Sequence, residues 1–198
     1  MHLGSDRADS AGWSTVARET VYADAHLQVT VAQVRTPQSQ HARSWTVVHR
    51  NRAVVIAPLT ADGRLVLLRQ ERIAVRATLW EVPAGQIDAV GEDERTVALR
   101  ELREETGYEL SPGGELVELG AFYSSPGFTD ERASLFLARG VQPSATGHSH
   151  QASESILDCR PFSPREVSAM IRRDEIQDAN TLSICAKLLT RGFLSLPL

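Results

Sequence analysis

Three carboxylates lie close together in one short stretch of the sequence, Arg100–Gly107. Glu101, Glu104 and Glu105 fall within five positions of a segment with helical character. Side chains three and four apart share a helix face, so these three are expected to converge on one patch. Hard divalent cations such as Mg²⁺ bind to such oxygen ligands together with phosphates. The stretch therefore predicts a metal site for phosphate chemistry, against the alternative of a solvated helix face with i,i+4 pairs such as Arg100 with Glu104.

The sequence around this stretch favours the metal site. The run LWEVPAG ends at Gly85, and a helix beginning near Glu92 is expected to stop at Gly107, a natural C-cap. From Glu92 onward, the spacing Glu, then Arg-Glu-x-x-Glu-Glu-x-Gly, resembles the Nudix hydrolase signature. Six residues separate Gly85 from Glu92 instead of the usual five, and the loop at 86–90 can absorb the extra one. Glu92 can support the site or, equally, complement the helix dipole.

The resemblance extends over about residues 13–192 and is to the ADP-ribose and nucleotide-sugar pyrophosphatase branch. It is carried by RQER at Arg69–Arg72, SPGFTDE at Ser125–Glu131 and IRRDEIQDANTL at Ile171–Leu182. Taken alone, Ser-Pro-Gly is also an ordinary turn between strands. Enzymes for GDP-mannose and other nucleotide sugars look similar to this branch.

The resemblance implies a Mg²⁺ site, with Mn²⁺ as the alternative cation. Glu101 and Glu105 would ligate the metal, and the carbonyl of Ala84 would supply a third oxygen. Glu104 would share the cluster, and Arg100 would orient and partly neutralise it. Catalysis at a pyrophosphate needs this arrangement because cations must offset the phosphate charge while a base takes the proton of the attacking water.

The segment expected to supply the general base carries fewer acids than the resemblance implies. Similar enzymes carry two or more acidic residues in a late loop, one completing the metal shell and one activating water. In the corresponding segment, 147–156, Glu154 is the only carboxylate and Ala152 stands where a second acid is expected. Glu154 can be the base or a metal ligand, and His148 or His150 can take the proton instead. A missing base costs about 10²–10⁴ in rate.

Substrate contacts are expected from several positions of the same motifs. Arg69 and Arg72 could bind the diphosphate or the terminal ribose, or be surface charges. Glu81 could accept hydrogen bonds from ribose hydroxyls or assist at the metal. Pro126 and Gly127 belong to the Ser-Pro-Gly element that the resemblance assigns to the substrate.

The N-terminal segment, residues 13–50, is expected to form a dimer. In this branch such strands reach across a homodimer and help to build the partner's nucleotide pocket. An aromatic or cationic residue from the second subunit would then stack on adenine or contact phosphate, and the sequence does not choose among Trp45, His49, Arg50 and Arg52. Trp45 can also belong to the dimer core.

Composition fits an ordinary globular enzyme. The chain has 198 residues, 42% of them hydrophobic and 23% charged, with a formal net charge of −4. That charge gives no basic footprint for nucleic acid or anionic lipid. Cys159 and Cys185 match no metal-binding spacing, and the N-terminus lacks the apolar region of a signal peptide. A cytoplasmic enzyme with no nucleic-acid or membrane partner is expected.

Hydrophobic patterning and turn residues predict an α/β fold. The expected strands are a hairpin or meander at 13–35, then 44–48, 53–59, 64–69, 116–123, 133–138 and 156–162. The expected helices are 92–106, 164–173 and 180–191. These elements predict a Nudix α/β/α sandwich with a mixed sheet, plus an N-terminal antiparallel β region. The expected divisions are a disordered tail at 1–12, a dimerisation region at 13–50 and a Nudix hydrolase domain at 51–198.

The predicted function is Mg²⁺-dependent hydrolysis of ADP-ribose to AMP and ribose 5-phosphate. One alternative is a pyrophosphatase for another nucleoside diphosphate sugar, such as GDP-mannose or UDP-glucose. A second is a non-catalytic nucleotide-sugar binding protein, which Ala152 favours and the intact carboxylate cluster opposes.

Overall fold

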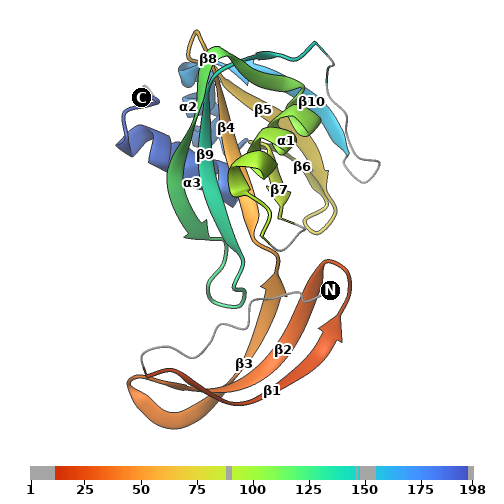
Figure 1. Cartoon of the computed structure of the whole chain (residues 1–198), viewed down its shortest axis with the longest axis vertical. Coiled ribbons are helices and arrows are strands. Elements are labelled where there is room, and N and C mark those ends of the chain that lie inside the picture. Colours follow the sequence, from red (N-terminus) through yellow and green to blue (C-terminus); the bar gives the residue numbers. More distant parts are fainter. Residues whose placement is uncertain (1–11, 88–90, 146, 148–154, 196–198) are drawn as a thin grey trace. The chain divides into compact units, whose positions relative to one another are not determined.

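The computed structural model describes residues 12–87, 91–145, 147 and 155–195 (Figure 1). The chain divides into two compact units. The N-terminal unit comprises Met1–Arg52 and Tyr123–Arg132, and the central unit comprises Ala53–Phe122 and Ala133–Leu198. The segment Tyr123–Arg132 thus belongs with strands that precede it by more than seventy residues.

The N-terminal unit is built on a three-stranded antiparallel sheet in the order β1-β2-β3. Its strands are β1 (Ser14–Ala23), β2 (Leu27–Thr36) and β3 (Ser39–Arg50). The turn between β1 and β2 is held by the Asp24 carboxylate, which accepts hydrogen bonds from the backbone N–H groups of His26 and Leu27. The predicted antiparallel region is confirmed, and its third strand is longer than the 44–48 run that the sequence predicted.

The central unit contains a seven-stranded mixed sheet within the described residues. Five strands follow the order β10-β5-β4-β9-β8, while β6 pairs with β5 and β7 pairs with β4. The sheet is mixed because β4 runs parallel to β9 but antiparallel to β5 and β7. The strands are β4 (Ala53–Thr60), β5 (Leu65–Arg72), β6 (Ala77–Glu81), β7 (Ala84–Gln86), β8 (Tyr108–Tyr123), β9 (Arg132–Pro143) and β10 (Ile156–Phe162).

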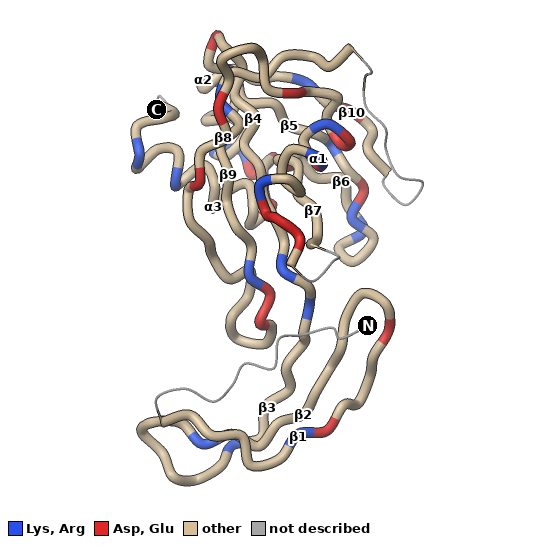
Figure 2. The backbone as a smooth tube through the Cα atoms, viewed as in Figure 1, with Lys and Arg blue, Asp and Glu red and all other residues tan. Residues whose placement is uncertain are grey.

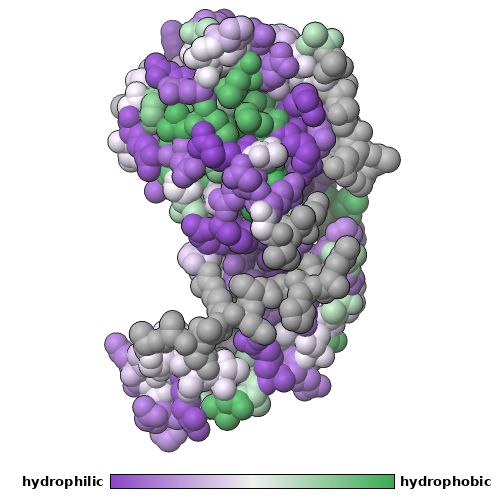
Figure 3. All heavy atoms as spheres, viewed as in Figure 1, coloured by the Kyte–Doolittle hydropathy of each residue, from purple (hydrophilic) through white to green (hydrophobic). Residues whose placement is uncertain are grey.

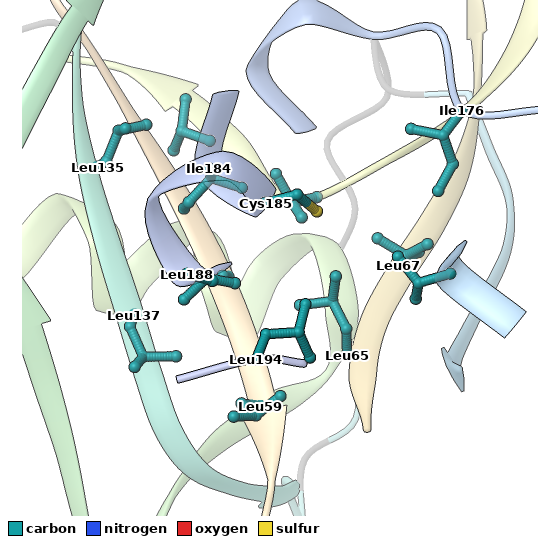
Figure 4. Packing of buried hydrophobic residues seen from close by; sticks show 14 of the residues in the cluster. Leu59, Leu65, Leu67, Leu135, Leu137, Ile176, Ile184, Cys185, Leu188 and Leu194 are labelled. Atoms are coloured by element: carbon teal, nitrogen blue, oxygen red, sulfur yellow. The ribbon is translucent and has the colours of Figure 1, made fainter. Parts of the chain in front are cut away.

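Helices cover both faces of this sheet. Helix α1 (Glu94–Thr106) packs on one face, where its Leu102 joins Ile56 and Phe136 in a buried cluster. Helices α2 (Pro164–Arg172) and α3 (Ala179–Thr190) cover the other face and contribute to a larger core (Figure 4). This arrangement confirms the predicted α/β/α sandwich.

Two differences from the sequence prediction concern the segments next to the carboxylates. Helix α1 begins at Glu94, two residues later than predicted, because Asp93 is the N-cap and accepts a hydrogen bond from the Thr96 N–H. Strands β6 and β7 were not predicted, since runs of five and three residues without alternation become strands only by pairing with β5 and β4. None of the described helices is long and apolar enough to cross a membrane.

Candidate active site

Helix α1 turns two of the three clustered carboxylates inward. Glu101 and Glu105 lie one helical turn apart and are only 5% and 4% exposed. Helix α1 ends where the sequence predicted, at Gly107, which has a φ of 70° and donates its N–H to the Arg103 carbonyl. Glycine adopts this left-handed conformation without steric cost, so the helix stops directly after its inward-facing acids.

Strand β7 forms a cradle for these two carboxylates. The backbone N–H of Ala84 donates a hydrogen bond of 2.9 Å to Glu105 Oε2. The Glu101 carboxyl group lies against Gly85, where a Cβ atom would stand 2.1 Å from Glu101 Cδ. Only glycine leaves room for a carboxylate at this position. We call these four residues, Ala84, Gly85, Glu101 and Glu105, the carboxylate cradle.

Arg100 bridges the cradle to the third carboxylate of the cluster. Its Nη1 atom lies 2.9 Å from Glu101 Oε1 and 3.1 Å from Glu104 Oε2. Partial burial opposes the charge on the guanidinium, but Glu101 and Glu104 together hold the pKa of Arg100 above its ordinary value. Glu104 is more exposed than the cradle acids and is held by Arg100 (Figure 2 shows charges of both signs along α1).

A partly buried ion pair joins neighbouring strands of the same sheet. Glu81, at the end of β6, is 1% exposed and receives hydrogen bonds from Nε and Nη2 of Arg72. Burial raises the pKa of the Glu81 carboxyl group, and Arg72 opposes that rise. The pKa of Arg72 is raised, first by these hydrogen bonds and further by the nearby Asp178 and Glu105 carboxylates.

The donors of the cradle fit a hard divalent cation. Two buried carboxylates and the adjacent backbone carbonyls are the oxygen ligands that Mg²⁺ takes, commonly one or two carboxylates together with phosphate oxygens and water. Among the described residues, no group of three or more His, Cys, Asp or Glu side chains is arranged to hold a metal ion by itself. The cradle therefore suits a cation that shares its shell with a bound phosphate.

Strand alternation separates two arginines that the sequence placed together. Arg69 pairs in register with Trp80, on the face covered by α2 and α3, and donates a long hydrogen bond of 3.5 Å to Thr78 Oγ1. Arg72 is three residues further along β5 and so lies on the opposite face, toward Glu81. The structure brings Arg72, but not Arg69, to the acidic cluster.

The other predicted substrate contacts lie in the N-terminal unit. Pro126 and Gly127 belong to the segment Ser125–Glu131, and Arg50 ends β3 and forms an ion pair of 3.0 Å with Glu131. Pro126 and Gly127 line a cavity of about 340 Å³ whose walls also include four aromatic residues, Trp13, Trp45, Tyr123 and Phe128. The candidate base Glu154, with His148, His150 and Ala152, lies outside the described residues. Glu92 directly precedes the Asp93 cap.

A buried hydrogen-bond chain, which the sequence did not predict, fixes Ser125–Glu131 to the N-terminal sheet. His49 Nε2 lies 2.8 Å from Thr30 Oγ1, and His49 Nδ1 lies 2.6 Å from Asp130 Oδ2. The Trp45 indole N–H also donates to the Gly127 carbonyl, at 2.9 Å. His49 therefore links the N-terminal sheet to the segment Ser125–Glu131, and its contact with a nucleotide stays a prediction.

Comparison with known proteins places the chain in a family. The NUDIX domain family matches residues 49–183. The ADP-ribose pyrophosphatase of Bacillus subtilis is 30% identical over 84% of this chain and 87% of its own length. The ADP-ribose pyrophosphatase of Mycobacterium tuberculosis is 31% identical over 91% of this chain and 86% of its own length. The methanol dehydrogenase activator of Bacillus methanolicus is 31% identical over 85% of this chain and 88% of its own length. A solved structure described as an ADP compounds hydrolase superposes with a TM-score of 0.71 at 19% identity, covering 94% of this chain and all of that one.

The chain belongs to the Nudix hydrolase family. The match spans the central sheet and α1, so the family assignment and the predicted fold are confirmed together. The prediction of an enzyme, a Nudix pyrophosphohydrolase, is confirmed as well.

Proposed function

We propose that the protein hydrolyses the pyrophosphate bond of ADP-ribose, giving AMP and ribose 5-phosphate, with Mg²⁺ as the cation. The observation that carries this proposal is the carboxylate cradle, in which Glu101 and Glu105 are buried against the backbone of Ala84 and Gly85. The names of two relatives, both ADP-ribose pyrophosphatases that align over most of the chain, support the choice of substrate.

In this mechanism the central unit holds the charged groups in place. Glu101 and Glu105, with the Ala84 carbonyl, would hold Mg²⁺, which supplies positive charge to the phosphate oxygens. Arg100 keeps the carboxylate of Glu101 oriented and offsets part of the negative charge of the cluster. Glu104 is held by Arg100 and supports the site at its more exposed side.

Arg72 and Glu81 act in substrate recognition under this proposal. Glu81 fixes the Arg72 guanidinium through two of its nitrogens, which leaves further N–H groups for a diphosphate oxygen. The Glu81 carboxylate in turn can accept from a ribose hydroxyl. Arg69, on the other face of the sheet, is the weaker candidate for either contact.

We assign the general base to Glu154, with His148 and His150 as the alternatives. This assignment rests on Glu154 being the only carboxylate in the segment 147–156. The Glu154→Gln variant is expected to lose at least about tenfold in kcat. An unchanged rate at saturating Mg²⁺ would remove Glu154 from the mechanism and direct attention to the two histidines.

The exposed apolar side chains of the N-terminal unit support a homodimer in which strands are exchanged. Val16, Val21, Tyr22 and Trp45 are each at least 50% exposed on β1 and β3, more apolar surface than so small a sheet usually shows to water. A second copy covering this sheet would bring Arg50, Pro126 and Gly127 to a nucleotide pocket. A cytoplasmic enzyme remains our expectation.

The substrate is tested by product analysis with purified protein and excess Mg²⁺. ADP-ribose, GDP-mannose, UDP-glucose and NADH are compared by chromatography. Two variants run alongside: Glu105→Gln, expected to lose more than about 100-fold, and Glu118→Gln, a glutamate with a 65% exposed side chain, expected to match the native rate. AMP released from ADP-ribose by the native protein and the Glu118 variant alone supports the proposal.

Two other outcomes would replace this proposal with one of its alternatives. Faster release of product from GDP-mannose or UDP-glucose would assign another nucleoside diphosphate sugar. Binding of ADP-ribose without turnover of any of the four compounds would indicate a nucleotide-sugar binding protein, with Ala152 as the reason for lost catalysis.

A further inference from the structure

The start of helix α3 is hydrogen-bonded to the segment that leads into the carboxylate cradle. Asp178, the N-cap of α3, accepts hydrogen bonds from both the N–H and the hydroxyl of Thr181, each at 2.8 Å. Because the hydroxyl proton goes to Asp178, the Thr181 oxygen is free to accept, and it does so from the Val82 N–H at 3.0 Å. Thr181 is fully buried and Val82 is 1% exposed, so water does not compete for these groups.

The Val82 N–H needs this partner because Val82 lies in a break between strands. Strand β6 ends at Glu81 and β7 begins at Ala84, so Val82 and Pro83 are outside both. Pro83 has no N–H, and its carbonyl accepts from the Ile56 N–H at 2.9 Å. The break is therefore held at two points, one on β4 and one on α3, and only the second comes from a side chain.

Both ends of this break carry groups of the site. Glu81, one residue before Val82, holds Arg72. Ala84 and Gly85 follow within three residues and contact Glu105 and Glu101. The backbone of Gly85 lies so close to Glu101 that even a Cβ atom at position 85 would overlap the Glu101 carboxyl group. A shift of the break by a fraction of an ångström would move the cradle backbone away from the carboxylates.

We propose that Thr181 and Asp178 are positioning residues for the metal site, acting through the Val82 backbone to hold the carboxylate cradle in shape. The effect passes from Asp178 and Thr181 to the Val82 N–H and then along the chain from Val82 to Gly85. This inference rests on the proposed metal-dependent function of the same cradle. It assigns a role to Asp178 and Thr181, which lie in the run Ile171–Leu182 that carries the family resemblance.

The test separates positioning from simple stabilisation of the fold. Thr181→Val keeps the shape and the β-branch of the side chain but removes the acceptor. Thr181→Ser restores the hydroxyl, and Thr190→Val is the matched control, since the Thr190 hydroxyl bonds only carbonyls in the last turn of α3. Titration calorimetry with Mn²⁺ gives the metal dissociation constant of each folded protein, and thermal unfolding gives its stability.

We expect Thr181→Val to raise the Mn²⁺ dissociation constant about ten- to hundredfold. Thr181→Ser is expected within threefold of the native value, and Thr190→Val unchanged. A Thr181→Val protein that unfolds at a lower temperature but binds Mn²⁺ with native affinity would overturn the proposal. If that variant does not fold, Asp178→Ala is used instead, because it removes the group that orients the Thr181 hydroxyl. Unchanged affinity in that protein would overturn the proposal equally.

Activity measurements keep this inference distinct from the proposed function. If the native protein binds Mn²⁺ and hydrolyses none of the four compounds, the proposed reaction fails while weaker binding by Thr181→Val still supports positioning. If the native protein releases AMP and Thr181→Val shows native half-activating Mg²⁺ and native Mn²⁺ affinity, the reaction stands and the positioning role is wrong.

Discussion

The two units differ in how far their sheets are exposed to solvent. In the central unit, β4 is buried at every position from Val54 to Leu59, because α1 packs on one face of the sheet and α2 and α3 pack on the other. In the N-terminal unit, eight consecutive residues of β1, Val16–Ala23, are exposed. On the drawn face of the central unit, a group of hydrophobic residues is surrounded by hydrophilic ones (Figure 3).

The two units therefore obtain their stability from different sources. The central unit buries a large hydrophobic core, to which residues such as Leu67, Leu137 and Ile184 contribute. The N-terminal unit instead relies on backbone pairing and on a few buried polar links, of which the Thr30–His49–Asp130 chain is the most enclosed. Three strands with so little burial are of marginal stability alone.

The largest expected effect is on the cradle of the central unit. Gly85→Ala should reduce kcat/KM more than about 100-fold, because the new Cβ displaces Glu101. Gly114→Ala is the matched control: its Cβ would stand 2.6 Å from the Gly140 carbonyl oxygen, a comparable overlap away from the carboxylates. Steady-state kinetics and thermal unfolding are measured for both. Equal loss of activity in the two proteins would mean that the cradle effect is only loss of folded protein.

A second prediction concerns the exposed face of the N-terminal unit. Val21, 54% exposed on β1, is replaced by Glu, which would bury a charge if a second copy covers this sheet. The dimer dissociation constant should rise roughly 10–100-fold, the equivalent of about 1–3 kcal/mol. Light scattering across a concentration series measures it, with Glu19→Gln on the same strand as a control. A native protein that is monomeric at all concentrations would contradict the dimer.

The third prediction addresses the polar links that hold the N-terminal unit together. His49→Gln should lower its free energy of unfolding by about 1–3 kcal/mol, because glutamine cannot place partners for Thr30 and Asp130 at once. His41→Gln, on the exposed part of β3, should have little effect. Hydrogen exchange of peptides from β2, β3 and Ser125–Glu131 is the readout. Protection unchanged by His49→Gln would show that backbone pairing alone suffices.

The smallest effect is expected at the cap of α2 in the central unit. Ser163→Ala should cost about 1 kcal/mol, or roughly 2–4 °C in Tm, without changing kcat. The Ser163 hydroxyl and N–H donate hydrogen bonds that hold the pKa of Glu166 below its ordinary value of 4.5. That stabilisation is present above this pH and is lost as pH falls, so the difference between variant and native Tm should shrink below pH 4.5. A difference that grows in acid would contradict this account.

The spacing of residues in a short segment predicted the acidic part of the site. It could not predict contacts between residues far apart in the sequence. Glu101, Glu105 and Gly107 follow from helical spacing and a C-cap glycine, both of which are readable within eight residues. The bond from Val82 to Thr181 joins positions 99 apart, and only the packing of α3 on the sheet brings them together. The sequence predicted a helix at 180–191 but gave no indication of what Thr181 contacts.

The structure also shows on which face of the sheet each of the two arginines of β5 lies. Arg69 and Arg72 look alike in the sequence, yet an odd separation along a strand places them on opposite faces. The alternation of side chains along a strand would have separated them, but the predicted strand ended at residue 69, whereas β5 continues to Arg72. The short strands β6 and β7 could not be predicted from the sequence, because their pairing with β5 and β4 defines them.

The discontinuity of the N-terminal unit has a consequence for how the protein forms during synthesis. His49 is made early, but its partner Asp130 follows 81 residues later, after β8 of the central unit. The first fifty residues therefore leave the ribosome without the segment that fixes them. Contacts of such long sequence separation form slowly, so the N-terminal sheet is expected to be completed late in folding.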